Sequence, residues 1–483
     1  MPSGTGSSKS ASRRNFIRNS AIAAGGFFII PRHVLGGKGY IAPSDQLAIA
    51  AIGAGGKARE NLSLSTQKGG ARIIALCDVD DRQAVWARSK FPSASYFHDF
   101  RKMLEKEAEN IDAVIITSPD HMHAVHALPA MKMGKHIYLE KPLTHDIAEA
   151  RLLTQAAAKY KVVTQMGNQG SSGKDTRLVE AWIQQGIIGK VHTVHVWTNR
   201  PVWPQGIKRP SGTAVVPPEV KWDLWLGTAP EKPYFQGLIP ANWRGWVDYG
   251  TGSLGDMGCH FLDVPYRSLK LGYPTSVECS AGSVYSGFFQ EVIQDESYPP
   301  SAKIHLQFTN NVHNVPVEVI WYDGGIKPQR PRELLPDESM GEIDGGMIFE
   351  GSEGKIMAGL FGRNPTLLPK AKMKEVELPK PQRPLVEGDW SGHQQQWVDA
   401  CKAGYGAYTS SPFEEAGPLT ETVLMGNLAV LSYMIREKNS MGGVDFPGRK
   451  KLLWNGEEMK ITNFSPANKF VKRIYRGNWD INL

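Results

Sequence analysis

Three short stretches of the 483-residue sequence carry side chains that could perform chemistry. Two of them are Glu140-Lys141-Pro142, which sets an amine beside a carboxylate, and residues 255–263, which read GDMGCHFLD. In the second stretch Asp256, His260 and Asp263 stand at positions i, i+4 and i+7, so on a helix they would share one face. An amine, an imidazole and a carboxylate around one substrate could move a proton to or from a hydroxyl near neutral pH.

The third stretch, residues 53–58, reads GAGGKA and lies between an apolar run and a run of good helix formers. A turn of this kind can cradle a pyrophosphate. Gly53 would form the tight turn, Gly55 and Gly56 would let the backbone approach the phosphates, and Ala58 would allow close contact between helix and strand. These four residues are therefore candidate cofactor-binding residues.

Asp78 supports this interpretation, because it lies twenty residues beyond Ala58 at the end of the next apolar run. A carboxylate at that position can accept hydrogen bonds from the hydroxyls of an adenosine ribose. It would also repel a 2′-phosphate, so the sequence predicts NAD as the cofactor, with NADP left open by the nearby Arg82. A glycine-rich turn with a capping aspartate is the alternative.

The elements that must position these residues alternate between strand-like and helix-like segments. The strand-like apolar runs are 47–53, 71–80, 112–119, 135–142 and 161–167. This alternation predicts a parallel sheet covered by helices on both faces. Ligands bind outside the carboxyl ends of such strands, so the glycine turn and the loops at 117–123 and 140–142 should face one crevice. The candidate cofactor-binding residues in those two loops are Ser118, Pro119, Asp120, His123, Glu140 and Lys141.

Beyond residue 190 the pattern changes to strand-like runs joined by Asn/Gly turns, which predicts a largely antiparallel sheet with helices on one face. The predicted fold class is α/β, with an N-terminal doubly wound (Rossmann) domain and a C-terminal α+β domain that holds a large, mostly antiparallel sheet. We expect a leader and linker at 1–42, the first domain at 43–190, the second domain at 191–440 and a tail that packs on the body at 441–483.

The stretch TSPDHMHAVHALPAMKMGKHIYLEKP (117–142) resembles the signature of the Gfo/Idh/MocA oxidoreductases, the family of glucose-fructose oxidoreductase and inositol dehydrogenase. GDMGCHFLD is similar to the D-x-G-x-H-x-x-D motif of that family, and GNQG at 167–170 and the C-terminal tail also match. The resemblance implies that Asp256 and His260 share proton transfer with Lys141, and that Asn168 and Gln169 contact the cofactor. It also implies a homo-oligomer formed through the exposed face of the second sheet.

Two alternatives to catalysis remain at these residues. One is a metal site that uses His260 with the two neighbouring carboxylates, or the histidines at 121, 123 and 126. Neither set is accompanied by further ligands of the right kind, so we expect no metal. The other is a helix cap at Asp256 with a structural histidine.

The first 42 residues are expected to be a targeting signal and linker rather than part of the folded domains. A Ser/Gly-rich start is followed by SRRNFIR at 12–18 and by an apolar run at 21–30, which resembles a twin-arginine export signal. The apolar run is too short to span a bilayer, and cleavage of the signal is left open. The expectation is a periplasmic protein that is exported by the twin-arginine machinery.

Charge and cysteine content exclude other classes of protein. Six of the seven net positive charges lie in residues 1–39, so the rest of the chain is nearly neutral. A neutral body gains little affinity for a phosphate backbone from counterion release, which excludes nucleic acid as a partner. The four cysteines are far apart and form no C-x-x-C pair, so we expect unbonded thiols and no zinc ribbon.

Taken together, these features predict an NAD(P)-dependent enzyme that transfers a hydride between a tightly bound nicotinamide cofactor and a hydroxyl-bearing carbon of a sugar, glycoside or polyol. Lys141 or His260 would accept the hydroxyl proton, and Asp256 would orient the substrate or His260. Six tryptophans within residues 197–246 weakly support a sugar ligand, although core packing accounts for half or more of them. Redox-neutral glycoside cleavage and a non-catalytic sugar-binding protein are the alternative functions.

Overall fold

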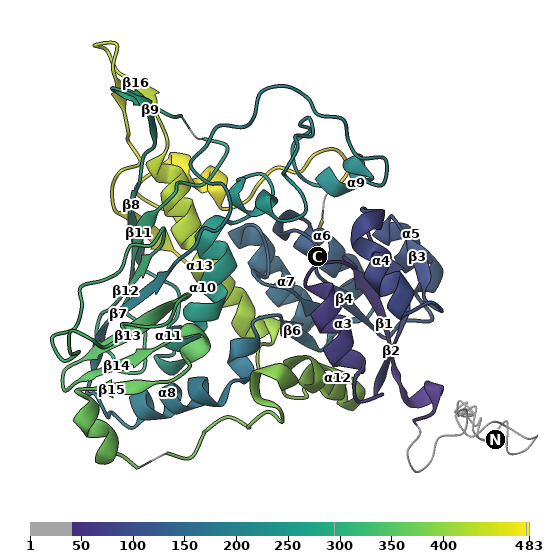
Figure 1. Ribbon diagram of the computed structural model, residues 1–483, viewed down its shortest axis with the longest axis horizontal. Coiled ribbons are helices and arrows are strands. Elements are labelled where there is room, and N and C mark those ends of the chain that lie inside the picture. Colours follow the sequence, from purple (N-terminus) through teal and green to yellow (C-terminus); the bar gives the residue numbers. More distant parts are fainter. Residues whose placement is uncertain (1–40, 294, 378, 480, 483) are drawn as a thin grey trace, which may run out of the picture. The chain divides into compact units, whose positions relative to one another are not determined.

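The structure is a computed structural model that describes residues 41–293, 295–377, 379–479 and 481–482 (Figure 1). The chain divides into two compact units, Met1–Gln46 and Leu47–Leu483. Of the first unit only residues 41–46 are described, with one short helical turn, η1, at Pro43–Asp45, so the predicted export signal lies outside the described residues. Among the described helices none is long and apolar enough to cross a membrane.

Six parallel strands form the first sheet of the larger unit, in the order β3-β2-β1-β4-β5-β6. Their bounds are β1 Leu47–Ile52, β2 Ala71–Cys77, β3 Ser95–Phe97, β4 Ala113–Ile116, β5 His136–Leu139 and β6 Thr164–Met166. This order reverses between β1 and β4, where a doubly wound fold opens its ligand crevice. The predicted Rossmann domain is confirmed, with β3 as a short strand that the apolar pattern did not indicate.

Helices cover both faces of this sheet. The helices on one face are α5 Phe100–Glu107, α6 His123–Lys132 and α7 Ile147–Tyr160; those on the other are α3 Ala58–Thr66, α4 Asp81–Lys90 and α12 His393–Ala403. In α12, Trp397 is fully buried and its ring meets Tyr138 of β5 edge to face at 5.6 Å. The core of the first sheet is therefore completed by a helix from far along the chain and is not confined to residues 43–190.

Nine strands form the second sheet, in the order β15-β14-β13-β7-β12-β11-β8-β18-β19. Their bounds are β7 Val191–Thr198, β8 Ser276–Ala281, β11 Ala302–Phe308, β12 Val317–Tyr322, β13 Gly345–Gly351, β14 Lys355–Ala358, β15 Thr366–Leu368, β18 Leu452–Asn455 and β19 Lys460–Ile461. Only β7 and β12 pair in parallel, which confirms the predicted, mostly antiparallel sheet. The predicted tail supplies β18 and β19 to this sheet.

Apart from α9, which contacts the loops after β2 and β4 of the first sheet, the remaining elements lie along the second sheet or between the two sheets (Figure 1). They are α8 Lys174–Gln184, α9 Trp222–Leu226, α10 Gly252–Phe261, α11 Asp263–Ser268, α13 Phe413–Tyr433 and two ribbons, β9 Tyr285–Gly287 with β10 Gln290–Glu291 and β16 Glu437–Lys438 with β17 Val444–Asp445. Helices α10, α11 and α13 share one hydrophobic core with the second sheet. The four cysteines, expected to be unbonded, are free thiols.

Residues 199–251, between β7 and α10, form a long segment that has little regular structure beyond α9. Aromatic side chains hold it together, because Trp225, Trp243, Trp246 and Tyr249 are buried in a cluster of their own. Trp197 in β7 is also buried. Core packing therefore accounts for at least four of the six clustered tryptophans, as the sequence indicated.

Candidate active site

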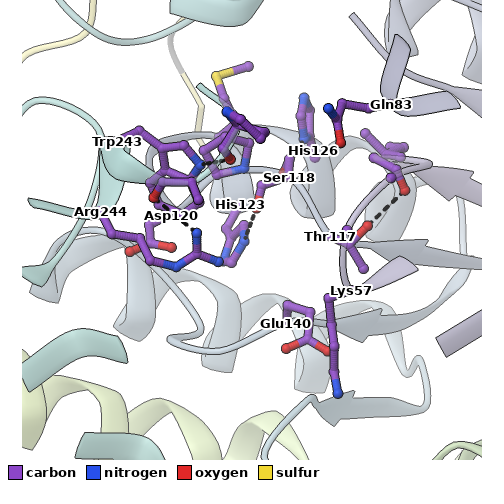
Figure 2. A pocket seen from close by; sticks show the side chains of 18 of the residues that line it. Lys57, Gln83, Thr117, Ser118, Asp120, His123, His126, Glu140, Trp243 and Arg244 are labelled. Atoms are coloured by element: carbon purple, nitrogen blue, oxygen red, sulfur yellow. Dashed lines mark hydrogen bonds between the residues drawn. The ribbon is translucent and has the colours of Figure 1, made fainter. Parts of the chain in front are cut away.

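One cavity of about 630 Å³ lies at the carboxyl ends of the parallel strands and is lined by residues of all three predicted stretches. Figure 2 shows part of its wall, with Lys57 beside the glycine turn and Glu140 at the end of β5. The predicted residues on its wall are Gly53, Gly55, Gly56, Asp78, Ser118, Pro119, Asp120, His123, Glu140, Lys141, Gln169, Asp256 and His260. Two predicted contact residues are described but lie off this wall. Ala58 is buried at the start of α3, and Asn168 is buried with its amide donating to Ser171 Oγ at 2.9 Å.

The glycine turn has the geometry that a pyrophosphate cradle requires. Gly53 has φ +84°, and a Cβ there would lie 2.8 Å from the carbonyl carbon of Thr117. Gly56 has φ +46°, and nothing lies within 4 Å of the position of its Cβ. Gly53 is therefore required by packing, whereas Gly56 leaves open space at the cavity wall beside the N-terminus of α3, where anions bind favourably.

Asp78 follows β2 and ties the glycine turn to it. One carboxylate oxygen accepts from Ala54 N at 2.7 Å and the other from Asp80 N at 2.9 Å, while burial raises the pKa of Asp78 to about 6. Arg82 pairs with Asp80 through both carboxylate oxygens, at 2.8 and 2.7 Å, and does not line the cavity. The ribose end of the cavity therefore presents a carboxylate, which fits a cofactor with free ribose hydroxyls.

Lys141 and Asp256 form an ion pair at the opposite end of the cavity. Lys141 Nζ donates to Asp256 Oδ1 at 2.8 Å and to the Asp256 carbonyl at 2.7 Å, and the Lys141–Pro142 peptide is cis. Burial alone would raise the pKa of Asp256, but Lys141 and Arg244 together hold it below its usual value. Asp256 lies inside α10, which begins at Gly252, so the alternative of a helix cap at Asp256 is wrong.

His260 lies one helical turn beyond Asp256 on the same wall. Burial lowers its pKa well below the usual value, and the charge of Lys141 acts in the same direction. The imidazole is therefore neutral near pH 7, and its Nδ1 is a buried atom with no hydrogen-bond partner among the described residues. An unpaired buried nitrogen is a costly feature, and a site for a substrate hydroxyl accounts for it.

Phe361 holds the His260 ring from the side. The two rings meet edge to face at 4.9 Å, and Phe361 adopts a left-handed backbone with φ +60°. A Cβ on Gly170 would lie 2.7 Å from Phe361, so the last glycine of GNQG makes room for this ring. Gly170 thereby acts on His260 through Phe361.

Asp263 does not join Asp256 and His260 in the cavity. It begins α11, where its carboxylate accepts from Arg267 Nε at 2.6 Å and from Ser171 Oγ at 2.5 Å. The third acid of the motif therefore fixes the junction of α10 and α11 instead of facing a ligand.

The clustered histidines connect loops. The two ring nitrogens of His123 lie 2.8 Å from the carbonyls of Pro142 and Ser118, so this ring joins the loops after β4 and β5. His121 lies against the carbonyls of Tyr249 and Trp225 at 3.2 and 3.0 Å. Within the described part of the chain no group of three or more ligating side chains could hold a metal ion.

Glu140 and Gln169 complete the floor of the cavity. Glu140 Oε1 accepts from Asn61 Nδ2 at 2.8 Å, and a Cβ on Gly167 would collide with the same carboxylate at 2.5 Å. With its amide turned to satisfy both neighbours, Gln169 lies 2.9 Å from Lys57 Nζ and 3.1 Å from the carbonyl of Gly167. Lys57 therefore adds a cation beside the glycine turn.

Several residues on the wall were not found from the sequence. They are Lys57, Gln83, Arg200, Arg244, Phe361 and Trp479. Trp225 and Trp243, from the tryptophan cluster that weakly supported a sugar ligand, also line the cavity. Arg244 Nε lies 3.5 Å and Arg200 Nε 4.0 Å from the Asp256 carboxylate, and Figure 2 shows Arg244 beside Asp120 and His123. Both arginines come from an aperiodic segment, where only their charge could have marked them.

The site has a glycine turn at the switch point of a doubly wound sheet, a carboxylate that can contact a ribose at one end of the cavity, and a Lys–Asp–His group at the other. This combination is typical of Rossmann-fold oxidoreductases. Two family models match the chain in order. Residues 47–168 match "Oxidoreductase family, NAD-binding Rossmann fold", and residues 177–286 match "Oxidoreductase family, C-terminal alpha/beta domain", both of the Gfo/Idh/MocA proteins. The chain is thus similar to both domains of the Gfo/Idh/MocA oxidoreductases, in the same order and together over just under half of its length, and the model that matches its first domain is described as NAD-binding.

Curated relatives match parts of the chain. It is 24% identical over 271 residues to the scyllo-inositol 2-dehydrogenase (NADP(+)) IolW of Bacillus subtilis, covering 56% of this chain and 60% of that protein. It is 29% identical over 150 residues to the D-glucoside 3-dehydrogenase of Escherichia coli, covering 31% and 42%. It is 24% identical over 202 residues to a glycosyl hydrolase family 109 protein of Shewanella pealeana, covering 37% and 44%. The matches thus span less than two thirds of each relative.

A solved structure supports the fold over a longer range. The crystal structure of GenD2 from gentamicin A biosynthesis, in complex with NAD, superposes with a TM-score of 0.54 at 16% identity. The superposition covers 89% of this chain and all of that one. At this identity the likeness establishes the two-domain architecture.

Proposed function

We propose that this protein transfers a hydride between a tightly bound NAD and a hydroxyl-bearing carbon of a sugar, glycoside or polyol. The observation that carries the proposal is the convergence of the glycine turn with Lys141, Asp256 and His260 on one cavity. The names of the relatives, an inositol dehydrogenase and a glucoside dehydrogenase, support a polyhydroxylated substrate. The cavity offers both apolar aromatic faces, from Trp225 and Trp243, and charged groups.

The chain's own residues would manage the proton. NAD, when bound, supplies the hydride-accepting nicotinamide. His260 is neutral and unpaired at Nδ1, so it is the group ready to accept the hydroxyl proton. The Asp256 carboxylate holds the Lys141 ammonium in place. In that position the remaining N–H of Lys141 can donate to the same substrate oxygen and stabilise the negative charge that develops there. Asp256 would then act as the positioning residue for Lys141.

A single-turnover experiment tests the proposed function. NAD-loaded protein is mixed with a panel of sugars, polyols and glycosides, and the reduced-nicotinamide absorbance is followed. We expect reduction with at least one member, and loss of that reduction by more than about 100-fold in His260→Ala, since a general base contributes 10²–10⁴-fold. Wild-type turnover in the His260→Ala and Lys141→Ala variants would refute the assignment of the proton chemistry.

Redox-neutral glycoside cleavage is the second candidate. The match to a glycosyl hydrolase family 109 protein favours it. In this reaction oxidation to a transient ketone would allow elimination of the aglycone with loss of a neighbouring proton. Water would then add to the double bond that forms, and the hydride would return to the carbonyl carbon. Product analysis separates the candidates, because cleavage releases a free sugar with no net change in nicotinamide, whereas oxidation leaves a ketone. Binding of sugars without either product would favour the non-catalytic alternative.

We also propose that the protein is exported to the periplasm by the twin-arginine route. The support is the sequence SRRNFIR followed by an apolar run. Because free NAD is not expected there, the cofactor would be bound before export and regenerated in place by a second substrate or within one catalytic cycle. Fractionation of cells that express the wild type and an Arg13→Lys/Arg14→Lys variant tests this, and an unchanged periplasmic fraction in the variant would contradict it.

Self-association through the second sheet remains a proposal as well. The face of the sheet opposite α10 and α13 carries half-buried polar and charged side chains, including His195, Glu318 and Glu350. Sedimentation of the wild type against a variant with one of these side chains reversed in charge would test it; a monomeric wild type would contradict it.

A further inference from the structure

Trp479, four residues from the C-terminus, lies on the wall of the cavity. Its indole ring is nearly parallel to the ring of Phe100, with centroids 6.3 Å apart and an interplanar angle of 23°. The guanidinium of Arg101 lies 4.6 Å from the centroid of the same indole. A side chain from far along the chain thus packs against Phe100 and Arg101 of the Rossmann domain at the cavity wall.

The position of Trp479 within the cavity identifies which part of the cofactor it would meet. Phe100 begins α5 directly after β3, and it shares this end of the cavity with His98, Asp99 and the Asp78 loop after β2. In a doubly wound sheet these loops flank the adenosine half of a dinucleotide, whereas Lys141 and His260 stand at the nicotinamide half. Trp479 therefore lies at the adenosine end.

Polar contacts anchor the segment that carries Trp479. Arg473 donates to Glu149 Oε1 at 2.6 Å and to Thr228 Oγ1 at 2.8 Å, and Tyr475 donates to the same Glu149 oxygen at 2.5 Å. Arg476 Nη1 donates to Asp223 Oδ1 at 2.7 Å. The segment is thus fixed both to the start of α7 in the Rossmann domain and to the α9 region, beside which it runs in Figure 1.

The α9 region is itself joined to the ribose-binding loop. Lys221 N donates to the carbonyl of Val79 at 2.8 Å, and Asp81 N donates to the carbonyl of Glu219 at 3.2 Å. Val79 follows Asp78 directly. Three parts of the chain that are distant in sequence, residues 78–81, 219–228 and 473–479, therefore enclose the same end of the cavity.

We propose that Trp479 is a cofactor-binding residue, whose indole together with Phe100 forms the apolar wall for the adenine base, and that the anchored segment 473–479 slows release of the cofactor. This inference rests on the proposed function, because it assumes a dinucleotide in the cavity. An aromatic face in contact with a base contributes about 1–3 kcal/mol, which corresponds to about 5- to 150-fold in affinity. If this segment must detach before the base can leave, it lowers the dissociation rate of the cofactor further.

The test is the rate at which NAD leaves the loaded, full-length protein, measured by chase with excess unlabelled NAD. We expect about tenfold faster release from Trp479→Ala, and an intermediate rate for Trp479→Phe, which keeps an aromatic face. Trp390→Ala is the matched control, because Trp390 is 47% exposed and does not line the cavity; its release rate should equal that of the wild type. Release from Trp479→Ala within twofold of the wild type would overturn the assignment.

A second variant tests the anchor without altering the cavity. The Asp223 side chain is 78% exposed, so Asp223→Ala should fold normally while removing the ion pair to Arg476. We expect release about threefold faster, as for the loss of a modest ion pair. An unchanged rate would overturn the contribution of the Asp223–Arg476 ion pair to cofactor retention. A wild-type protein that binds no NAD at all would instead refute the proposed function, so the two failures are distinguishable.

Discussion

Gly56→Ala provides a sharp test of the phosphate cradle, because the structure separates its effect on folding from its effect on binding. Gly56 has φ +46°, is exposed, and has no heavy atom within 4 Å of the position of its Cβ. Gly134, just beyond α6, has φ +73°, is equally exposed and is equally free of neighbours, but it does not line the cavity. Gly134→Ala is therefore a matched control for the backbone cost alone.

The expected magnitudes follow from these environments. An alanine in the left-handed region costs about 1–2 kcal/mol, so both variants should lose a similar, small part of their stability. At residue 56 the added methyl group would also stand at the cavity wall where the pyrophosphate approaches the backbone. Loss of one hydrogen bond to a charged group costs about 1.5–3 kcal/mol, so the Kd of Gly56→Ala for NAD should rise by about 10- to 100-fold.

Calorimetric titration with NAD and thermal unfolding of the cofactor-free proteins measure the two effects separately. We expect both variants to unfold at nearly the same temperature, slightly below the wild type, while only Gly56→Ala loses NAD affinity. If the two variants bind NAD with Kd values within threefold of each other, the glycine turn does not hold the phosphates, and the cofactor assignment fails with it.

Three further predictions concern protonation and packing. The acid limb of the profile of kcat against pH should lie below pH 6.5, since His260 must be neutral to accept a proton and its pKa is lowered. Lys141→Met removes a cation that lowers the pKa of His260, so this limb should move to higher pH. An unmoved limb would contradict the role of His260. NAD should bind more weakly as the pH falls through about 6, because protonation of Asp78 removes an acceptor for the ribose hydroxyls. The Asp78→Asn variant should bind NAD weakly at every pH. A wild-type Kd for NAD that does not change across this pH range would exclude Asp78 as a ribose ligand. Trp397→Ala should destabilise the protein by about 3–5 kcal/mol in denaturant unfolding, since the side chain is fully buried in α12 against the first sheet, and a loss below about 1 kcal/mol would show that α12 is dispensable to that core.

The Rossmann domain could be predicted because its strands are buried on both faces. Such strands appear in the sequence as unbroken apolar runs, as in Leu47–Ile52, where all six residues are buried. The glycine turn and Asp78 have a fixed spacing because one must contact the pyrophosphate and the other the ribose of the same dinucleotide, so the sequence predicted both. By contrast, β3 has only three residues, all half-buried, and leaves no comparable pattern.

Long-range placement limited the prediction of the site. Asp256 and His260 were recognised from their spacing, but the same spacing also included Asp263, which the break at Leu262 turns toward Arg267. Arg200 and Arg244 come from a segment without periodicity, and Trp479 from the C-terminal tail, so no local pattern connects them with the cavity. The position of α12 likewise depends on tertiary packing that periodicity does not encode.

The most direct test of this account is a crystal structure of the protein in complex with NAD. We predict that the pyrophosphate contacts the backbone of residues 53–57, that Asp78 accepts from the adenosine ribose, and that the nicotinamide faces Lys141, Asp256 and His260. A dinucleotide bound elsewhere, or one whose nicotinamide points away from these three side chains, would contradict the central claim.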